Sequence, residues 1–395
     1  MEMRTSLDEQ SILAEARAKA GLDDFGDESF REPLRVLLAA LDTEARLVDF
    51  GRVAQRSRVV DLLVNRLRAE EQFRLHPEIL TEEIGAPLVI VGLPRTGTTL
   101  LHRTLAQDPR LYSVRWFECR YPAPFPGGAT GADDPRIAQA KAEVQAMLAG
   151  SPALAAIHPL DAMAADEEIL LLEHSFLSTV PESGANVPSY GRWLDAHDQT
   201  PAYRYLRKLL QLLQWQKRRA GHPAERWVLK TPHHLGLADV LLEVFPGALI
   251  IQTHRDPLDS IPSLASMITA LWVLVAEKVD PKEVARQWSA KMATALRRCL
   301  EVRDRHPDRF IDVWFLDAVQ DPVGQARRIY EVAGLAFTPE VEHAMRAFMA
   351  TNPREGRPPH QYTLEEFGLS AEGIARDFAE YRARFILKRS DRGHE

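Results

Sequence analysis

The pattern of hydrophobic and polar positions divides the chain into helices and short buried strands. Up to about residue 75, apolar residues recur at helical spacing, as in 36–41 and 59–67, which predicts amphipathic helices. Four later segments are short, apolar and rich in β-branched residues, which is typical of buried strands. They are APLVIVGL (86–93), RWVLK (226–230), ALIIQTH (248–254) and RFIDVWF (309–315).

Predicted helices separate these strands, for example at 98–107, 236–245 and 281–305, and another at 324–335 follows the last strand. Strands that alternate with helices form parallel sheets with right-handed crossovers. We therefore predict an α/β protein with a P-loop-like parallel sheet flanked by helices. Its parts are an N-terminal helical segment (1–86), a main domain (87–370) with a largely helical insertion at about 119–225, broken near 180–191, and a C-terminal helix (371–395).

The composition argues against several classes of protein. The 395 residues carry a formal net charge of −7, which disfavours capture of nucleic acid by a broad basic surface. Two cysteines, Cys119 and Cys299, are too few for a disulfide framework. The first ten residues show no apolar signal-peptide core, and the longest apolar run (268–276) is shorter than the roughly 20 residues that span a bilayer. We expect a cytoplasmic protein without a membrane span.

The segment PLVIVGLPRTGTTLLHRTLAQDP (87–109) has the outline of a phosphate-binding loop. Gly92 and Gly97 are separated by four residues between a predicted strand and a predicted helix. This arrangement directs backbone N–H groups and a helix N-terminus toward an anion. A Walker loop carries a lysine directly after the second glycine, but Thr98 stands there and the cation is Arg95. The loop therefore suits one terminal phosphate-like group better than a triphosphate with magnesium.

A second anion site is predicted just past the strand at 248–254. Arg255 follows the strand, and Asp256 and Pro257 begin the next helix as its cap and first residue. Ser263 comes eight residues after Arg255, about two helical turns on, so the two side chains can share one phosphate. Open α/β sheets bind ligands at the carboxyl ends of their strands, where both loops fall.

The motifs PRTGTT (94–99) and HRDPLDSIPS (254–263) resemble those of the PAPS-dependent sulfotransferases, where PAPS is 3′-phosphoadenosine 5′-phosphosulfate. Within that family the chain is most similar to bacterial sulfotransferases grouped with the tyrosylprotein type, over about 87–369. The resemblance implies transfer of a sulfuryl group from PAPS to a hydroxyl of a small-molecule, carbohydrate or lipid acceptor, without a metal ion.

The resemblance also implies which residues bind the nucleotide. The 5′-phosphosulfate is expected at the first loop and the 3′-phosphate at the second. The matching positions are Arg95, Thr96, Gly97, Thr98 and Thr99 for the first, and Arg255 and Ser263 for the second. The later segment REGRPPHQYTLEEFGL (354–369) resembles the family's nucleotide-covering loop, in which Arg357 is the first candidate ligand and Arg354 the second.

The family pattern offers several catalytic candidates. Arg95 and Lys230, the last residue of RWVLK, match cations that stabilise charge developing on the leaving 5′-phosphate. For the general base we favour Glu118, the nearest match, offset by a few residues, to the glutamate that follows the first helix in the tyrosylprotein type. His234 and His233 are close alternatives, because Lys-Thr-Pro-His-His (230–234) resembles the Lys-Thr-His pattern of cytosolic sulfotransferases with one proline inserted.

Other interpretations remain open from the residues alone. Glu167 or Glu168 in the insertion is a weaker candidate for contact with a substrate hydroxyl, since charged helix faces are usually solvated. His233, His234 and His254 offer a minor metal-site option. A P-loop kinase or NTPase, or a catalytically inactive nucleotide-binding protein, is the alternative function.

Overall fold

The computed structural model describes residues 5–128, 131–150, 160–352 and 363–390. Its centre is a five-stranded sheet in the order β2-β3-β1-β4-β5, in which every neighbouring pair is parallel. The strands are β1 (Leu88–Gly92), β2 (Leu111–Tyr112), β3 (Arg226–Lys230), β4 (Leu249–His254) and β5 (Phe310–Trp314). The predicted α/β class is confirmed. The sequence pattern missed β2, because two residues are too short to show a periodicity.

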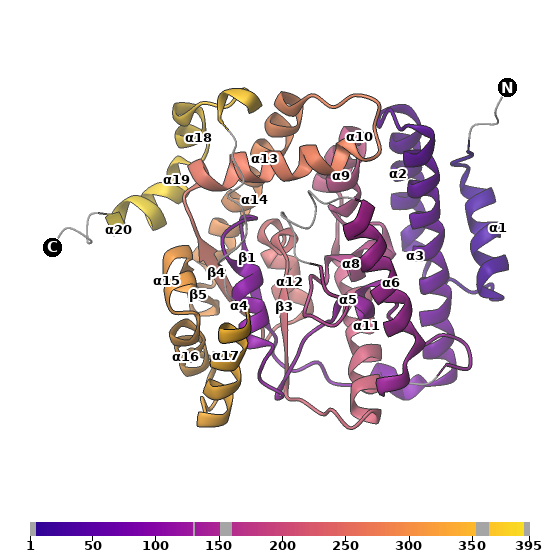
Figure 1. Ribbon diagram of the computed structural model, residues 1–395, viewed down its shortest axis with the longest axis horizontal. Coiled ribbons are helices and arrows are strands. Elements are labelled where there is room, and N and C mark those ends of the chain that lie inside the picture. The colour runs from indigo at the N-terminus through magenta and orange to yellow at the C-terminus, as the bar shows by residue number, and fades with distance from the viewer. Residues whose placement is uncertain (1–4, 129–130, 151–159, 353–362, 391–395) are drawn as a thin grey trace.

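The sheet is covered by helices on both faces (Figure 1). Side chains of successive strand residues point to opposite faces, and β1 divides its apolar residues accordingly. Leu88 and Ile90 pack with helices α4, α16 and α17, whereas Val89 and Val91 belong to the larger core formed with α11, α12 and α14. A strand buried on both faces has to be apolar throughout, which is the pattern read in the sequence.

The helices flanking the sheet connect its strands or follow the last strand, β5. They are α4 (Thr98–Leu105), α11 (Thr200–Arg219), α12 (Ala238–Val244), α13 (Pro257–Val273), α14 (Pro281–Arg305), α15 (Phe315–Gln320), α16 (Pro322–Ala333) and α17 (Pro339–Thr351). The C-terminal segment contains α18 (Ala371–Asp377), α19 (Ala379–Arg382), the π-helix η8 (Ala383–Leu387) and α20 (Lys388–Ser390). None of the helices in the described part of the chain combines the length and apolarity needed to cross a bilayer.

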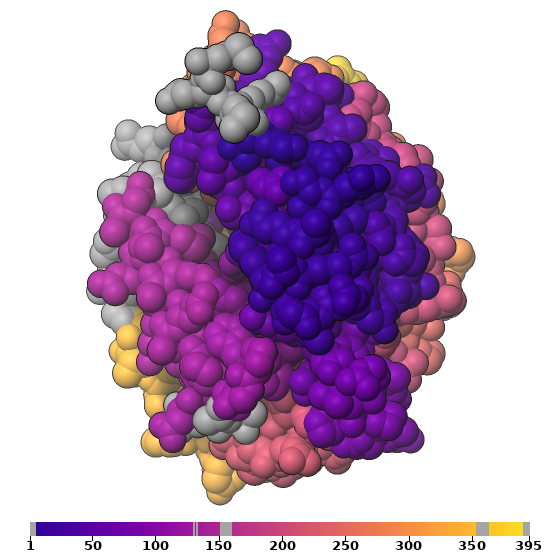
Figure 2. Space-filling model, turned by 90° about the vertical axis from the view of Figure 1, so that its right-hand side faces the viewer, coloured from indigo at the N-terminus to yellow at the C-terminus, as the bar shows by residue number. Residues whose placement is uncertain are grey.

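The N-terminal helices form one side of the molecule. These are α1 (Glu9–Ala20), α2 (Arg31–Thr43) and α3 (Asp49–Leu75), with short helices η1 (Glu28–Phe30) and η2 (Pro77–Thr81) beside them. Figure 2 shows their indigo surface next to the magenta surface of the insertion. Their apolar residues, including Leu34, Leu63 and Leu67, join the same core as the sheet residues Val89 and Leu229.

The insertion between β1 and β3 is mostly helical, as predicted. It contains α5 (Trp116–Arg120), η3 (Gly131–Asp133), α6 (Pro135–Gly150), α8 (Ile169–Leu172), η4 (Glu173–Ser175), α9 (Val180–Gly184), α10 (Pro188–Ala196) and α11. We predicted that the helical insertion is interrupted at 180–191. The structure is partly helical there, because Pro181 and Pro188 each occupy the start of a helix. A short helix η5 (Pro232–Gly236) follows β3 directly.

Candidate functional site

The anion loop lies between β1 and α4 at the carboxyl edge of the sheet. Gly97, with φ +84°, precedes Thr98, the first residue of α4, and a Cβ there would lie 3.2 Å from the ring of Phe315. Arg95 has φ +71°, a conformation that costs a non-glycine residue about 1–3 kcal/mol and that clusters at functional sites. Thr96 is completely buried, and its Oγ1 contacts the carbonyl of Leu93 at 2.6 Å. The loop thus has a fixed shape that presents the N-terminus of α4 to an anion.

The structure joins the two predicted anion sites into one cluster. Arg95 Nε donates to Ser263 Oγ on α13 at 3.3 Å, and Arg255 Nη1 donates to the Arg95 carbonyl at 2.9 Å. The Arg255 guanidinium lies 4.3 Å from the centre of the Phe315 ring. The cations therefore converge at the carboxyl ends of β1 and β4, where an extended polyanion can contact both.

Three residues that shape this cluster, Phe315, Thr253 and Arg382, were not singled out in the sequence. Phe315 packs under both Gly97 and Arg255, and Thr253 Oγ1 lies 2.6 Å from Thr96 Oγ1. Asp256 caps α13 and accepts two hydrogen bonds from Arg382, each of 3.0 Å. The positions of Phe315 and Thr253 in the sequence could have pointed to the site, since each lies at or just past the carboxyl end of a strand.

Lys230 connects the anion loop to the insertion. Its side chain is 1% exposed, and its Nζ lies 3.4 Å from Thr99 Oγ1 and 2.5 Å from Glu167 Oε1. The Glu167 side chain is 23% exposed. A buried ammonium is stable only with charged or polar partners, and here they come from α4 on one side and from the segment before α8 on the other.

His234 and Glu168 form a closed hydrogen-bonded group behind Lys230. His234 Nε2 lies 2.7 Å from Glu168 Oε1, and its Nδ1 lies 2.6 Å from the Tyr203 hydroxyl. The other oxygen of Glu168 accepts the backbone N–H of Lys230 at 2.8 Å. Both side chains are completely buried. Because both ring nitrogens of His234 are engaged, the arrangement does not support His234 as the base and gives it instead a role in fixing the end of β3.

The structure places Glu118 away from this cluster. One carboxylate oxygen accepts the backbone N–H of Arg115 at 2.8 Å and so caps α5, and the other pairs with the ammonium of Lys217 on α11. Glu118 is buried and is not among the residues that line the cavity beside the loop. Sequence spacing after the first helix could not show this, because it does not say toward which helix the carboxylate turns.

A cavity of about 410 Å³ opens from the anion loop into the helical insertion. Its near end contains Arg95, Thr98, Thr99, Asp166 and Glu167. Its walls also include apolar side chains of α8, α9 and α13 and residues of η5, α10 and α14. The apolar residues include Ile169, Val180, Leu264, Ile268 and Leu271, and the polar residues include His233, Asp195, Gln199 and Lys291. Such a concave, mostly apolar site with a few polar groups is the usual form of a small-molecule site.

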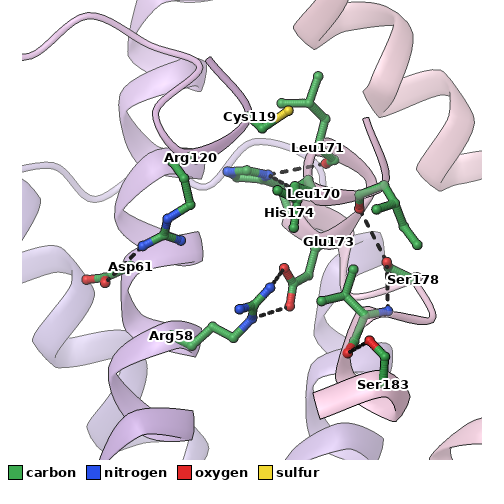
Figure 3. Close-up of polar contacts among 12 residues, drawn as sticks. Arg58, Asp61, Cys119, Arg120, Leu170, Leu171, Glu173, His174, Ser178 and Ser183 are labelled. Carbon is green, nitrogen blue, oxygen red and sulfur yellow. Dashed lines mark hydrogen bonds and ion pairs between the residues drawn. The ribbon is translucent and has the colours of Figure 1, made fainter. Parts of the chain in front are cut away.

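One wall of the cavity is attached to the N-terminal helices (Figure 3). Arg58 on α3, which lines the cavity, binds both oxygens of the buried Glu173 at 2.7 and 2.5 Å. Two carbonyls of α8 contact His174 Nδ1 at 3.0 and 3.2 Å. Burial lowers the pKa of His174 to about 3, so this imidazole is neutral at physiological pH. These contacts fix the segment that carries Glu167 and Glu168.

The structure does not place the remaining predicted residues in this cluster. Arg357 and Arg354 lie outside the described residues. His254 binds Asp312 and Tyr381, at 2.8 and 3.2 Å, rather than approaching the other histidines. Among the residues that the structure describes, no three histidine, cysteine, aspartate or glutamate side chains gather as a metal site.

Comparisons with known proteins agree with this geometry. The model of the sulfotransferase family matches residues 87–339. The crystal structure of sulfotransferase STF9 from Mycobacterium avium has a TM-score of 0.87 at 29% identity, over 98% of this chain and 99% of that one. STF1 from Mycobacterium tuberculosis H37Rv has a TM-score of 0.83 at 31% identity, over 94% and 98%. The curated Mycobacterium tuberculosis protein named omega-hydroxy-beta-dihydromenaquinone-9 sulfotransferase Stf3 is 28% identical over 298 residues, 72% of each chain.

The family match covers more than half of the chain and includes the anion loop, Lys230 and the second anion site. The similarity to the two crystal structures extends over nearly the whole chain. The predicted sulfotransferase function is confirmed, and the kinase or NTPase alternative is set aside. The chain belongs to the sulfotransferase family and is a transferase.

Proposed function

We propose that this enzyme transfers a sulfuryl group from PAPS to the hydroxyl of a mostly apolar small-molecule acceptor. The position of Lys230 carries the proposal, because its ammonium contacts the anion loop through Thr99 and the acceptor cavity through Glu167. A donor anion in the loop and an acceptor in the cavity meet at this one cation.

The residues of the anion cluster fit the charges of this donor. Arg95, the backbone of the loop and the start of α4 suit the 5′-phosphosulfate, while Arg255 and Ser263 suit the 3′-phosphate. Arg255 already touches the loop through the Arg95 carbonyl, so the two sites are close enough for one nucleotide. The loop has no Walker lysine, in keeping with a donor that binds without the magnesium of a nucleoside triphosphate.

The donor supplies an activated sulfuryl group, whose transfer forms a sulfur–oxygen bond to the acceptor and breaks the one to the 5′-phosphate. Lys230 and Arg95 stabilise the negative charge that the leaving phosphate gains. We assign the general base to Glu167, because its carboxylate lines the cavity beside Lys230 and is partly exposed there. Glu167 receives the proton of the acceptor hydroxyl as the new bond forms. This replaces Glu118, which caps α5.

The acceptor class follows from the cavity and from a relative. The cavity is lined largely by apolar side chains, which favours an acceptor with an apolar body. The relative Stf3 is named for an ω-hydroxylated acceptor, which supports transfer to a hydroxyl here.

A binding comparison tests the donor. The product nucleotide 3′,5′-adenosine bisphosphate, at about 100 times its Kd, should stabilise the protein by about 2.7 kcal/mol. ATP with magnesium at the same concentration should stabilise it much less, as measured by the shift of the denaturation midpoint. Equal or greater stabilisation by ATP with magnesium would contradict the proposed donor.

A further inference from the structure

The C-terminal segment packs against the turn that carries the second anion site. Arg255 stands in the turn 254–256, between β4 and α13. His254 and Asp256, on either side of it, contact the segment 381–385, which begins 127 positions after His254. Figure 1 shows α18 and α19, in yellow, beside the start of α13. The segment lies beyond residue 339, where the match to the sulfotransferase family ends.

Arg382 binds both carboxylate oxygens of Asp256. Its Nε and Nη2 donate to Oδ1 and Oδ2 at 3.0 Å each. The two side chains are 15% and 22% exposed, so the ion pair is largely shielded from water. Asp256 Oδ1 also accepts the backbone N–H of Leu258 and so caps α13. Because a bidentate pair fixes the orientation of a carboxylate as well as its position, Arg382 holds one end of the turn.

The other end of the turn is held by Tyr381 and Phe385. His254 Nδ1 lies 3.2 Å from the Tyr381 hydroxyl, and the His254 ring stacks on that of Phe385 with centroids 4.3 Å apart. A hydrogen bond also joins the Tyr381 phenol to the backbone of Arg255. Burial holds the pKa of this phenol above its usual value, so it stays uncharged at physiological pH. Each of the three residues of the turn therefore has a partner in the segment 381–385 or a direct bond to it.

The C-terminal segment is itself anchored by apolar packing. Four of its side chains are buried in the core that also contains Ile261 and Leu264 of α13. They are Ile374, Phe378, Tyr381 and Phe385. Arg382 adds an ion pair to this anchoring and no apolar side chain. Loss of its guanidinium would therefore free Asp256 while the segment stays packed on the protein.

The Arg255 side chain depends on a fixed backbone. It is 24% exposed, and its ion pair with Asp259 is long, at 3.4 Å. Its firmer contacts are the hydrogen bond to the Arg95 carbonyl at 2.9 Å and the Phe315 ring at 4.3 Å. A long, partly exposed side chain loses freedom when it binds a ligand, and this loss weakens binding less where the protein has already ordered the side chain.

We propose that Arg382 and Tyr381 are positioning residues that hold the turn 254–256 so that Arg255 selects a nucleotide carrying a 3′-phosphate. They act through Asp256, His254 and the backbone of Arg255 rather than by contact with the nucleotide. Without them Arg255 keeps its charge, but the nucleotide has to order the turn as it binds. The inference rests on the proposed function, whose donor site it specifies.

The test measures how much the 3′-phosphate adds to binding. Calorimetry gives the Kd of 3′,5′-adenosine bisphosphate and of adenosine 5′-monophosphate, which differ only in that group, and the ratio of the two values is the discrimination. In the wild type it should be about 10- to 150-fold, the factor for a charge-assisted hydrogen bond. Arg382→Met should lower it by about 2- to 10-fold, as expected when binding must order one more long side chain. A loss of folded protein affects both Kd values alike and cancels from the ratio.

Further variants separate positioning from stability. Asp256→Asn can still cap α13 but loses its charge, so it should lower the ratio as Arg382→Met does, and the double variant should lower it no further. Arg382→Lys can reach one carboxylate oxygen and should restore part of the ratio. Tyr381→Phe keeps the buried ring and should cause a smaller fall. Arg384→Met is the matched control, because Arg384 makes a similar bidentate pair with Asp304 outside the turn, and it should leave the ratio unchanged.

An unchanged ratio in Arg382→Met would overturn the inference. So would an equal loss of affinity for both nucleotides, because the ion pair would then contribute to stability alone. Failure of the proposed donor has a different result: the wild type would bind the two nucleotides equally, and both the donor and the inference would fall. A large ratio in the wild type that is lost in Arg255→Ala and intact in Arg382→Met would keep the donor and reject the positioning role.

Discussion

Lys230 and Glu167 form an ion pair in which Nζ lies 2.5 Å from Oε1, at the boundary between the anion loop and the acceptor cavity. The two residues are 63 positions apart, one at the end of β3 and the other just before α8. In the proposed reaction, the pair holds a cation and a proton acceptor together where the donor and acceptor substrates meet. It therefore orders the transfer site before either substrate binds.

The first prediction concerns the base. Glu167→Gln should lower kcat about 10²- to 10⁴-fold, because a positioned general base contributes that much, and it should keep the affinity for 3′,5′-adenosine bisphosphate. Steady-state kinetics with an aliphatic alcohol and calorimetric nucleotide titration measure the two effects.

Glu118→Gln is the matched control. It should keep kcat near the wild-type value but lower the free energy of unfolding on the order of 3 kcal/mol, because it leaves the buried Lys217 without its counter-charge. A large fall of kcat in Glu118→Gln, with Glu167→Gln nearly unaffected, would return the role of base to Glu118.

The second prediction separates the roles of the two paired residues. Lys230→Met should lower kcat for every acceptor, because it acts on the leaving phosphate. The defect of Glu167→Gln should shrink as the acceptor becomes more acidic, since a phenol needs less help in losing its proton than an alcohol does. A plot of log kcat against acceptor pKa for each variant measures this. Parallel plots for the two variants would argue against the division of roles.

The third prediction concerns the second anion site. Arg255→Ala should weaken binding of 3′,5′-adenosine bisphosphate by about 1.5–3 kcal/mol, as expected for a charge-assisted hydrogen bond. Ser263→Ala should weaken it by about 0.5–1.5 kcal/mol. Arg297→Ala, at an exposed position on α14, serves as the control. Calorimetric Kd values measure all three, and an unchanged Kd in Arg255→Ala would remove this residue from the site.

The fourth prediction concerns stability in acid. Burial raises the pKa of Asp312, but hydrogen bonds from His254 and Arg303 outweigh it and hold the pKa at about 2, below the usual 3.8. A lowered folded-state pKa stabilises the protein above pH 3.8, and this stabilisation is lost as the pH falls toward 2. It amounts to about 2 kcal/mol at neutral pH, of which about half is lost by pH 3.

Asp312→Asn should therefore be less stable than the wild type at pH 7, and the difference should narrow between pH 5 and pH 3. Urea unfolding at each pH measures it, with Asp308→Asn as an exposed control. A difference that stays constant over this range would show that Asp312 has an ordinary pKa in the folded protein.

The sequence by itself determined the fold class and located the two loops of the proposed donor site. Strands buried on both faces must be continuously apolar, and a loop that presents backbone N–H groups needs glycine at fixed spacing. Both features depend on neighbouring residues only, so the sequence shows them directly. Lys230, Arg255 and Ser263 could also be predicted as candidates, because carboxyl ends of parallel strands necessarily share one edge of the sheet. The sequence did not reveal the two-residue strand β2 or the order of the strands in the sheet.

Only the tertiary structure decided the acceptor side. The sequence does not distinguish the glutamates Glu118, Glu167 and Glu168. In the structure, however, Glu118 caps α5, Glu167 lines the cavity and Glu168 is buried against His234. Which of these occurs depends on Lys217, Lys230 and His234, which lie far away in the chain and reach these carboxylates only after the insertion packs on the sheet. Gln199 likewise comes to line the cavity only in the folded protein. Local patterns fix the elements and their edge, while the direction of a long side chain is set by partners that folding brings to it.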